Sequence, residues 1–441
     1  MRNFPDRLLL LFVAIPVLAF AADGRAAKAV EPLTLPQARR IAMDNNPQIK
    51  ADTYAYHAAE EDVVAARSFY LPQVNANMVG AFAGAGSRIA VMSSGLTDPT
   101  VLERGSGGVA ISQLVTDFGR TIAQIDASRA AQESGRQHIA LSRARVVLAV
   151  TIAYFEALRA EALTEIARST LQARDVLLQQ VSSLRDVQMK SDLDLSISRQ
   201  GVDAADLLLL REQNARADAM AQLSQAMGYA ETHDFTLSKP AEPLPPLGAV
   251  DALVQTALTD NPELAALRAD AEAARQQAEA AKAESYPTLN AMGFAGLTPY
   301  SETKQPIARD YAVSGFNLSI PLFAGGRLSA DADKAAFQAH AAEMRFNVRK
   351  NELIRDIQVA FDRANTAYKN MSVTQRMHQN AILSLQLTRT RYDIGLSSIV
   401  DLYQVELAET EAAAAEADAG YDYLEQRAVL DYVLGKYSLG E

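Results

Sequence analysis

The sequence predicts a mainly α-helical chain built from two copies of one plan, in which each copy joins a short strand hairpin to a very long helical hairpin. Three observations predict this fold class: residue pairs that recur at a constant separation in the sequence, two long stretches without proline, and short segments in which polar and apolar residues alternate. The composition fits, because the chain is 49% hydrophobic but only 7% aromatic. Much of the apolar content is alanine, which suits long packed helices.

The duplication is visible in short marks that recur along the chain. Asn46-Pro47 recurs as Asn261-Pro262, a shift of 215 residues, and Gly119-Arg120 recurs as Gly326-Arg327, a shift of 207 residues. Two constant shifts that differ by a single length change in a loop are hard to obtain by chance. We therefore expect the second half of the chain to repeat the fold of the first.

The boundaries follow from the ends of the repeat. We divide the chain into a signal peptide over 1–21, a first copy over 22–229, a proline-rich linker over 230–247 and a second copy over 248–441. Arg2 and Arg7 precede an apolar run of about 13 residues, which is too short to span a bilayer and ends in small residues typical of a cleavage site. The linker contains Pro240, Pro243, Pro245 and Pro246, which cannot continue a helix.

Each copy is expected to begin with a helix and two strands. Asn46 and Asn261 are predicted N-caps, each followed by proline at the first helical position. Alternation with a period of two predicts strands over about 72–86 and 106–116, and over about 287–298 and 310–321. Glycine-rich loops are expected between the strands of each pair, and the glycines of 105–108 are interpreted as loop rather than as a phosphate cradle, because no GK[ST] motif or helix follows.

The rest of each copy is predicted to be a helical hairpin. Long helices are expected over about 120–187 and 192–228, and over about 327–392 and 397–436. At 1.5 Å rise per residue, the first helix of each pair would be a rod of roughly 100 Å. Gly395 marks the second turn, and Gly228 and Gly435 are predicted C-caps at the ends of the hairpins.

Amphipathic strands in an exported chain suggest an outer-membrane β-barrel. An open sheet cannot lie in lipid and bacterial barrels have about eight strands or more, so four strands per chain would require several chains. Alternation alone leaves a second interpretation open, a soluble periplasmic coiled-coil scaffold or adaptor protein with ordinary sheet strands. Because the chain has no tryptophan, the aromatic belt of a barrel would have to consist of Phe82, Tyr300, Tyr311 and Phe316.

Several function classes are excluded by composition. The absence of cysteine excludes disulfides, thiolate metal sites and a cysteine nucleophile, and a net charge of −11 without a basic run argues against a nucleic-acid binder. The five histidines show no paired metal-ligand spacing, so no catalytic, cofactor or metal site is expected. One acidic run is interpreted as a solvated helix face; it consists of Glu406, Glu409, Glu411 and Glu416.

The second hairpin turn resembles a known family. Tyr392-Asp-Ile-Gly395 followed by Ile399-Val-Asp-Leu402, together with the duplicated marks, is similar to the TolC-like outer membrane efflux proteins. The resemblance implies a homotrimer whose twelve strands form one transmembrane barrel in outer-membrane lipid, continued by a periplasmic α-helical tunnel. It also implies passive export of small molecules or secreted protein, together with a periplasmic adaptor protein and an inner-membrane transporter, and no bond chemistry.

The resemblance further implies that the periplasmic entrance is closed by links among tyrosine, arginine and aspartate side chains near the second turn. Tyr392 and Asp401 match this pattern. Ser397 and Gln404 stand where the family has an arginine and a second aspartate, which would weaken the closed gate.

In the first copy, Asp194 is equivalent to Asp401, Gln188 replaces the turn glycine, and Arg185 stands opposite Tyr392, where it could supply the missing positive charge. Helix capping is the other interpretation of the two aspartates. It is favoured for Asp194, and both interpretations are open for Asp401.

Overall fold

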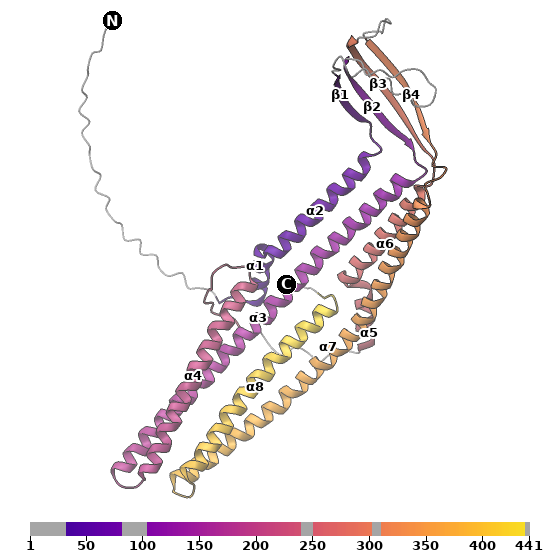
Figure 1. The fold of residues 1–441 in the computed structure, drawn as a ribbon. Coiled ribbons are helices and arrows are strands. Elements are labelled where there is room, and N and C mark those ends of the chain that lie inside the picture. Colours follow the sequence, from indigo (N-terminus) through magenta and orange to yellow (C-terminus); the bar gives the residue numbers. More distant parts are fainter. Residues whose placement is uncertain (1–31, 82–103, 240–249, 302–309, 437–441) are drawn as a thin grey trace, which may run out of the picture.

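A computed structural model describes residues 32–81, 104–239, 250–301 and 310–436 of the chain. Figure 1 shows an elongated molecule with a four-stranded sheet at one end and long helices that run from it to two hairpin turns at the other end. The chain is mainly helical, as predicted. The predicted signal peptide, the four linker prolines and Phe82 lie outside the described residues.

Both copies have the same order of elements. In the first copy these are α1 (Leu35–Asn45), α2 (Pro47–Ser68), β1 (Gln73–Ala81), β2 (Arg104–Thr116), α3 (Arg120–Asp186) and α4 (Asp192–Ala226). In the second copy they are α5 (Val250–Asp260), α6 (Pro262–Ala283), β3 (Thr288–Ser301), β4 (Asp310–Ser319), α7 (Arg327–Asp393) and α8 (Ile399–Val433).

The helices before the strands begin at capped positions. The Asn46 side chain accepts a hydrogen bond from the amide of Gln48, and the Asn261 side chain accepts one from the amide of Glu263. Proline follows each asparagine, so the predicted N-caps are confirmed. Helices α1 and α5, of 11 residues each, are not among the predicted elements. Helices of this length are marginal alone and depend on packing, as at Ala42 and Ala257, which are fully buried.

The sheet joins the two copies. Its order is β1-β2-β3-β4, all neighbours are antiparallel, and β2 of the first copy pairs with β3 of the second. Two of the predicted loop segments are strand instead, because β2 begins at Arg104 and β3 continues to Ser301. The loop interpretation of 105–108 is therefore wrong. Glycine in a strand marks a close backbone approach, and Gly108 and Gly296 are paired across β2 and β3.

The helices continue the layer that the strands begin. Beside the sheet, α2, α3, α6 and α7 pack in the same order as β1 to β4 (Figure 1). Toward the other end, α3 and α4 form one hairpin, α7 and α8 form the other, and α3 packs against α8. Buried residues divide into a large cluster around Tyr154, a second around Ile357 and a third at the hairpin turns around Tyr392. The fold is therefore one curved layer with an unpaired edge on each side among the described residues.

Candidate functional site

The sheet has one polar and one apolar face. Register partners in an antiparallel sheet share a face, so Gln73 of β1 lies beside Ser112 of β2, and Asn290 of β3 lies beside Asn317 of β4. The opposite face carries exposed apolar side chains, among them Val74, Met78, Ile111, Phe316 and Leu318. One face thus suits water and the other suits lipid, which is the pattern of a barrel wall.

Among the residues of the predicted belt, Tyr300 lies in β3, and Tyr311 and Phe316 lie on opposite faces of β4. Phe316 is 78% exposed and pairs with Ala291 on the apolar face. Tyr311 pairs with Gly296, at an even number of residues from Asn317, and so belongs to the polar face. A lipid-facing belt that contains both Phe316 and Tyr311 is therefore wrong, and their separation of five residues in one continuous strand already indicated opposite faces.

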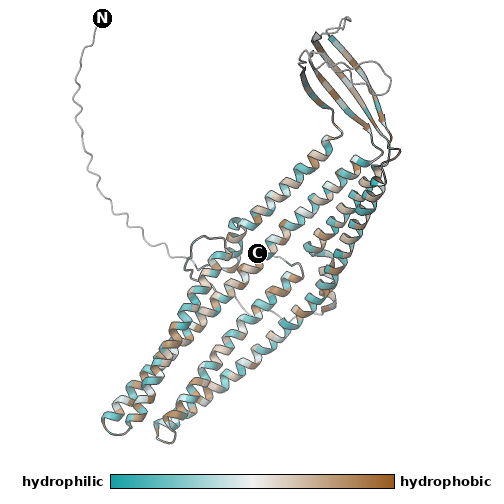
Figure 2. Cartoon of the chain, viewed as in Figure 1, coloured by the Kyte–Doolittle hydropathy of each residue, from teal (hydrophilic) through white to brown (hydrophobic). Residues whose placement is uncertain are grey.

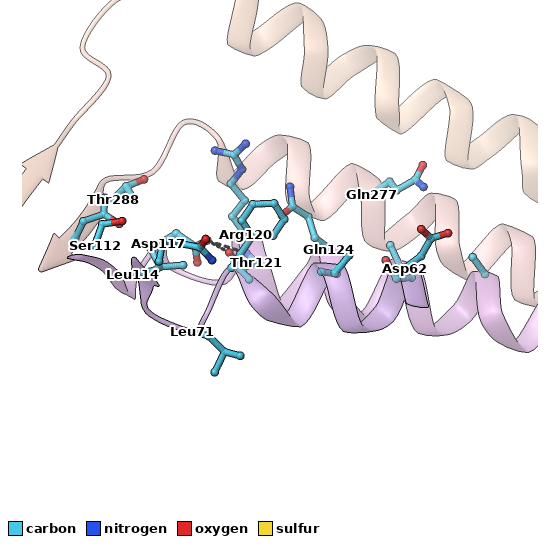
Figure 3. A pocket seen from close by; sticks show the side chains of 18 of the residues that line it. Asp62, Leu71, Ser112, Leu114, Asp117, Arg120, Thr121, Gln124, Gln277 and Thr288 are labelled. Atoms are coloured by element: carbon cyan, nitrogen blue, oxygen red, sulfur yellow. Dashed lines mark hydrogen bonds between the residues drawn. The ribbon is translucent and has the colours of Figure 1, made fainter. Parts of the chain in front are cut away.

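A cavity of about 770 Å³ lies where the polar face of the sheet meets the helices (Figure 3). Gln73, Ser112 and Thr288 line it from the strands, and Arg120 and Gln277 line it from α3 and α6. Polar residues therefore line this junction from both the sheet and the helices, together with apolar residues such as Phe69, Leu71 and Leu114.

The entry into α3 is fixed beside this cavity by Asp117, which is 4% exposed. Its Oδ2 accepts hydrogen bonds from the amide and the hydroxyl of Thr121, at 2.8 and 2.5 Å (Figure 3). Gly119, with φ of 103°, makes the left-handed turn before the helix. Across the layer, an Nη of Arg120 lies 3.1 Å from Glu284 beyond α6. These contacts hold the strands and helices in one fixed orientation.

At the hairpin turns, Asp194 and Asp401 occupy equivalent positions in α4 and α8. Each closes a capping box, because its carboxylate accepts hydrogen bonds from the amide and hydroxyl of Ser191 or Ser398. The hydroxyl of Ser397 also donates to Asp401, at 3.2 Å. Hydrogen bonds from Ser398 and Ser397 lower the pKa of Asp401, so this exposed carboxyl is charged at neutral pH. Both aspartates therefore cap helices, and Asp401 also presents its charge to solvent.

The other predicted gate residues are arranged differently. Nε of Arg185 lies 2.9 Å from Asp192 within its own hairpin turn. Tyr392 is 3% exposed in the cluster that joins the two hairpins, and Nζ of Lys190 lies 3.8 Å from its ring centroid. Lys190, which the sequence did not single out, is thus the cation on Tyr392.

Gln404 is exposed on α8, one turn beyond Asp401. The two turns have the same backbone conformation, since Gln188 has φ of 63° and Gly395 has φ of 78°. The glutamine therefore adopts the left-handed conformation that glycine adopts in the second copy.

A buried ion pair joins the two hairpins on the side of the turns that faces the sheet. An Nη of Arg174 on α3 lies 2.5 Å from a carboxylate oxygen of Glu406 on α8, and the two side chains are only 6% and 10% exposed. The Arg174 guanidinium also lies 4.2 Å from the ring centroid of Tyr403. Gly201 of α4 makes room for this ring, because a Cβ there would lie 3.0 Å from it. Burial raises the pKa of Glu406, and the charge of Arg174 opposes that rise.

This arrangement corrects the interpretation of the acidic run on α8. Glu406 is 8% exposed and faces the seam rather than solvent. Glu416 and Glu409 both contact His378 of α7, at 2.5 and 3.4 Å from its two ring nitrogens. Of the four glutamates, Glu411 is exposed as predicted. A signal was present in the sequence, because Arg174 lies three residues before Leu177 and Glu406 lies four after Leu402, both in register with the buried seam.

A second group of buried acids lies between α3 and α8 nearer the middle of the molecule. The Glu425 side chain is 13% exposed and lies 4.0 Å from an Nη of Arg159. Burial raises the pKa of Glu425 to about 7, while Arg159 opposes the rise and Glu156, Asp422 and Asp418 add to it. Burial likewise raises the pKa of Asp418. This region therefore holds carboxyl groups that gain protons on folding.

Neither a metal centre nor a spanning helix is found in the described ranges. Within them, no group of three or more histidine and acidic side chains is arranged to hold a metal ion. No described helix is long and apolar enough to cross a bilayer, and Figure 2 shows hydrophilic and hydrophobic residues interspersed along every long helix.

Comparison with known proteins gives consistent results. The family described as "Outer membrane efflux protein" matches residues 39–229 and 253–436. Outer membrane protein TolC of Vibrio cholerae is 24% identical over 421 residues, covering 93% of this chain and 92% of that protein. The alkaline protease secretion protein AprF of Pseudomonas aeruginosa is 25% identical over 181 residues, covering 41% of this chain and 37% of that protein. The crystal structure of the outer membrane protein VceC from Vibrio cholerae superposes with a TM-score of 0.76 at 18% identity, covering 91% of this chain and 96% of that one.

Proposed function

This chain belongs to the outer membrane efflux protein family, and on that premise we propose how its own surfaces form an export duct. The protein is an outer-membrane channel with a periplasmic helical tunnel, and it conducts small molecules or secreted protein from the periplasmic end to the exterior. The observation that carries the proposal is the set of polar residues that lines the junction from the sheet onto α3 and α6. We assign this surface to the lumen, and we assign the protein no bond chemistry.

Three copies would close the duct. Within the described residues, β1 and β4 each have only one neighbour, so each presents an edge of unpaired backbone groups. Unpaired backbone groups are costly in lipid, and pairing β4 of one copy with β1 of the next removes both edges. Three copies of a four-stranded sheet give one barrel of twelve strands.

The helices at the two edges support the same assembly. The outer side of α7 exposes a row of apolar side chains, namely Phe337, Met344, Val348, Val373, Leu383 and Leu387. On the other edge, α2 exposes Tyr54 and Val64. Exposed apolar surface of this extent marks a protein interface. In a homotrimer, α2 of the next copy would cover the part of the row near the sheet, and α4, which exposes Leu207 and Leu210, would cover the part near the hairpin turns.

The partners are a periplasmic adaptor protein and an inner-membrane transporter. A passive duct needs an energised partner to load it. Because the hairpin turns are the part of this chain farthest from the sheet, we assign the partners to that end. The name of AprF supports a secreted protein as cargo, and the family description supports efflux. The alternative, a soluble periplasmic scaffold or adaptor, is not favoured by these relationships.

The periplasmic entrance is assigned to the two hairpin turns. The buried Tyr392 holds the second hairpin against the first, with Lys190 on its ring, while Asp401 exposes its charge beside Ser397. Asp194 and Arg185 stabilise the first turn, and Gln404 contributes no charge. Three copies of Asp401 would form a negative ring that favours cations.

Asp401→Ala is therefore expected to reduce cation preference and cation block in single-channel recordings from planar bilayers. Asp194→Ala is the matched control, because it removes an equivalent capping box. Both variants should lose stability by about 1 kcal/mol per copy through loss of the cap. Only Asp401→Ala should alter selectivity. Unchanged selectivity in Asp401→Ala would leave this residue a helix cap and remove it from the gate.

Fractionation tests the proposed function as a whole. Wild-type protein should be found in the outer-membrane fraction and should run as a heat-modifiable oligomer on gels without boiling. Recovery as a soluble periplasmic monomer would overturn the proposal.

A further inference from the structure

An aromatic side chain lies across two glycine positions on the polar face of the sheet. Gly108 of β2 is the register partner of Gly296 of β3, and Gly296 is the partner of Tyr311 of β4. A Cβ built on Gly296 would lie 2.7 Å from Oη and 2.8 Å from Cζ of Tyr311. One built on Gly108 would lie 3.1 Å from the same Oη. The phenol therefore reaches over β3 toward β2 and rests directly on their backbones.

The two glycines form a recess that no other residue would leave open. A Cβ on Gly108 would lie 2.6 Å from the carbonyl oxygen of Ala295, and one on Gly296 would lie 2.6 Å from that of Gly107. Contacts this short require a shift of backbone or ring. With a side chain at either position, the ring of Tyr311 would be lifted from the strands and would point away from the wall.

The side chains around the recess are less polar than those on the part of the same face that lies near the helices. Asn290 and Asn317 are paired near the helices. Two register steps further out, Phe294 is paired with Val313, and both are exposed. On β3 and β4 the polar face thus becomes apolar and aromatic toward Tyr311, while β1 keeps Asn75 and Asn77 on the same face.

We propose that Gly108 and Gly296 seat Tyr311 flat against the duct wall, and that this seat sets the free width of the duct at that level. The inference rests on the proposed function, because it takes the polar face as the lumen. Three copies would place three rings around one cross-section. Lying flat, they leave passage for bulky cargo, and lifted rings would obstruct it.

A labelling experiment tests the seat, and the chain contains no cysteine that would interfere. Asn317→Cys places a reporter thiol on the same face, closer to the helices than Tyr311. Maleimides coupled to membrane-impermeant polymers of small and large size are added outside intact cells. The reporter is combined with Gly296→Ala, with Tyr311→Ala, with both, and with Gly315→Ala. Gly315 is the matched control, since a Cβ there meets no atom within 4 Å on the same face.

We expect Gly296→Ala to slow labelling by the large reagent at least about fivefold while leaving the small reagent unaffected. Tyr311→Ala added to Gly296→Ala should restore the rate, and Gly315→Ala should not change it. Tyr311→Ala alone should change the rate less than about twofold, because a ring lying on the wall obstructs little. Trimer formation is checked on unboiled gels for each variant.

Three results would overturn the inference. Equal rates in Gly296→Ala and its parent would show that the ring is not displaced into the duct. A double variant that stays slow would assign the effect to distortion of the strands. Much faster labelling by the large reagent in Tyr311→Ala, with both glycines intact, would show that the ring already stands in the duct. A reporter thiol that even the small reagent fails to reach would instead contradict the lumenal assignment, and with it the proposed function.

Discussion

Arg174→Ala is expected to lower the free energy of unfolding by about 3–5 kcal/mol, because it leaves the carboxylate of Glu406 buried without its partner. Loss of the contact between the guanidinium and Tyr403 adds to the effect. The change should appear as a large drop in the midpoint of thermal unfolding, followed by far-ultraviolet circular dichroism in detergent.

Two variants separate this explanation from a general loss of helix stability. Arg168→Ala removes an exposed pair with Glu165 on the same helix and should cost no more than about 1 kcal/mol. Arg174→Met combined with Glu406→Leu replaces both charges with apolar groups of similar volume and should recover most of the loss. If the double variant were as unstable as Arg174→Ala, the buried charge would not be the cause.

Glu425→Gln is expected to stabilise the protein in alkaline solution and to have little effect in acid. Burial raises the pKa of Glu425 from 4.5 to about 7, so the folded state binds a proton more tightly than the unfolded state. Proton binding by Glu425 therefore stabilises the folded state fully below about pH 4.5, and this stabilisation is lost as the pH rises through about 7. Above pH 7 the wild type loses about 3 kcal/mol of this stabilisation, whereas Glu425→Gln keeps its stability because its amide stays neutral.

The measurement is the difference in unfolding midpoint between Glu425→Gln and the wild type at about pH 5 and about pH 8.5. Comparing the two proteins at each pH removes the contribution of buried acids that do not interact with Glu425, such as Asp431. Glu165→Gln, at a carboxylate that is 67% exposed, should show no such dependence. A difference that is the same at both pH values would mean that Glu425 does not titrate in this range.

The helices and the polarity of the strands could be predicted because they depend on local pattern. Proline-free stretches predict α3 and α7, and the alternation from Gln73 to Met78 predicts β1 and its two faces. Helices α1 and α5 could not be predicted in the same way, because helices of 11 residues depend on partners distant in sequence.

The site was harder to predict because its contacts join distant residues. Glu406 looked solvated within its own helix, and only the packing of α8 against α3 buries it against Arg174. Lys190 was missed because its position over Tyr392 depends on how the two hairpin turns meet. Tyr311, in contrast, was grouped with Phe316 although the two lie five residues apart in one strand, a spacing that already indicated opposite faces.

Disulfide cross-linking between β1 and β4 tests the closed barrel most directly. Asn75→Cys on β1 is combined in turn with Val313→Cys, Gly315→Cys and Asn317→Cys on β4, all on the polar face. Within one copy these strands are separated by three strand spacings of about 4.8 Å, which is beyond the reach of a disulfide. We predict that oxidation of at least one pair gives covalent species of two and three copies and none larger. Oxidation that leaves every pair monomeric, or a ladder that continues past three copies, would contradict a barrel closed by three copies of this chain.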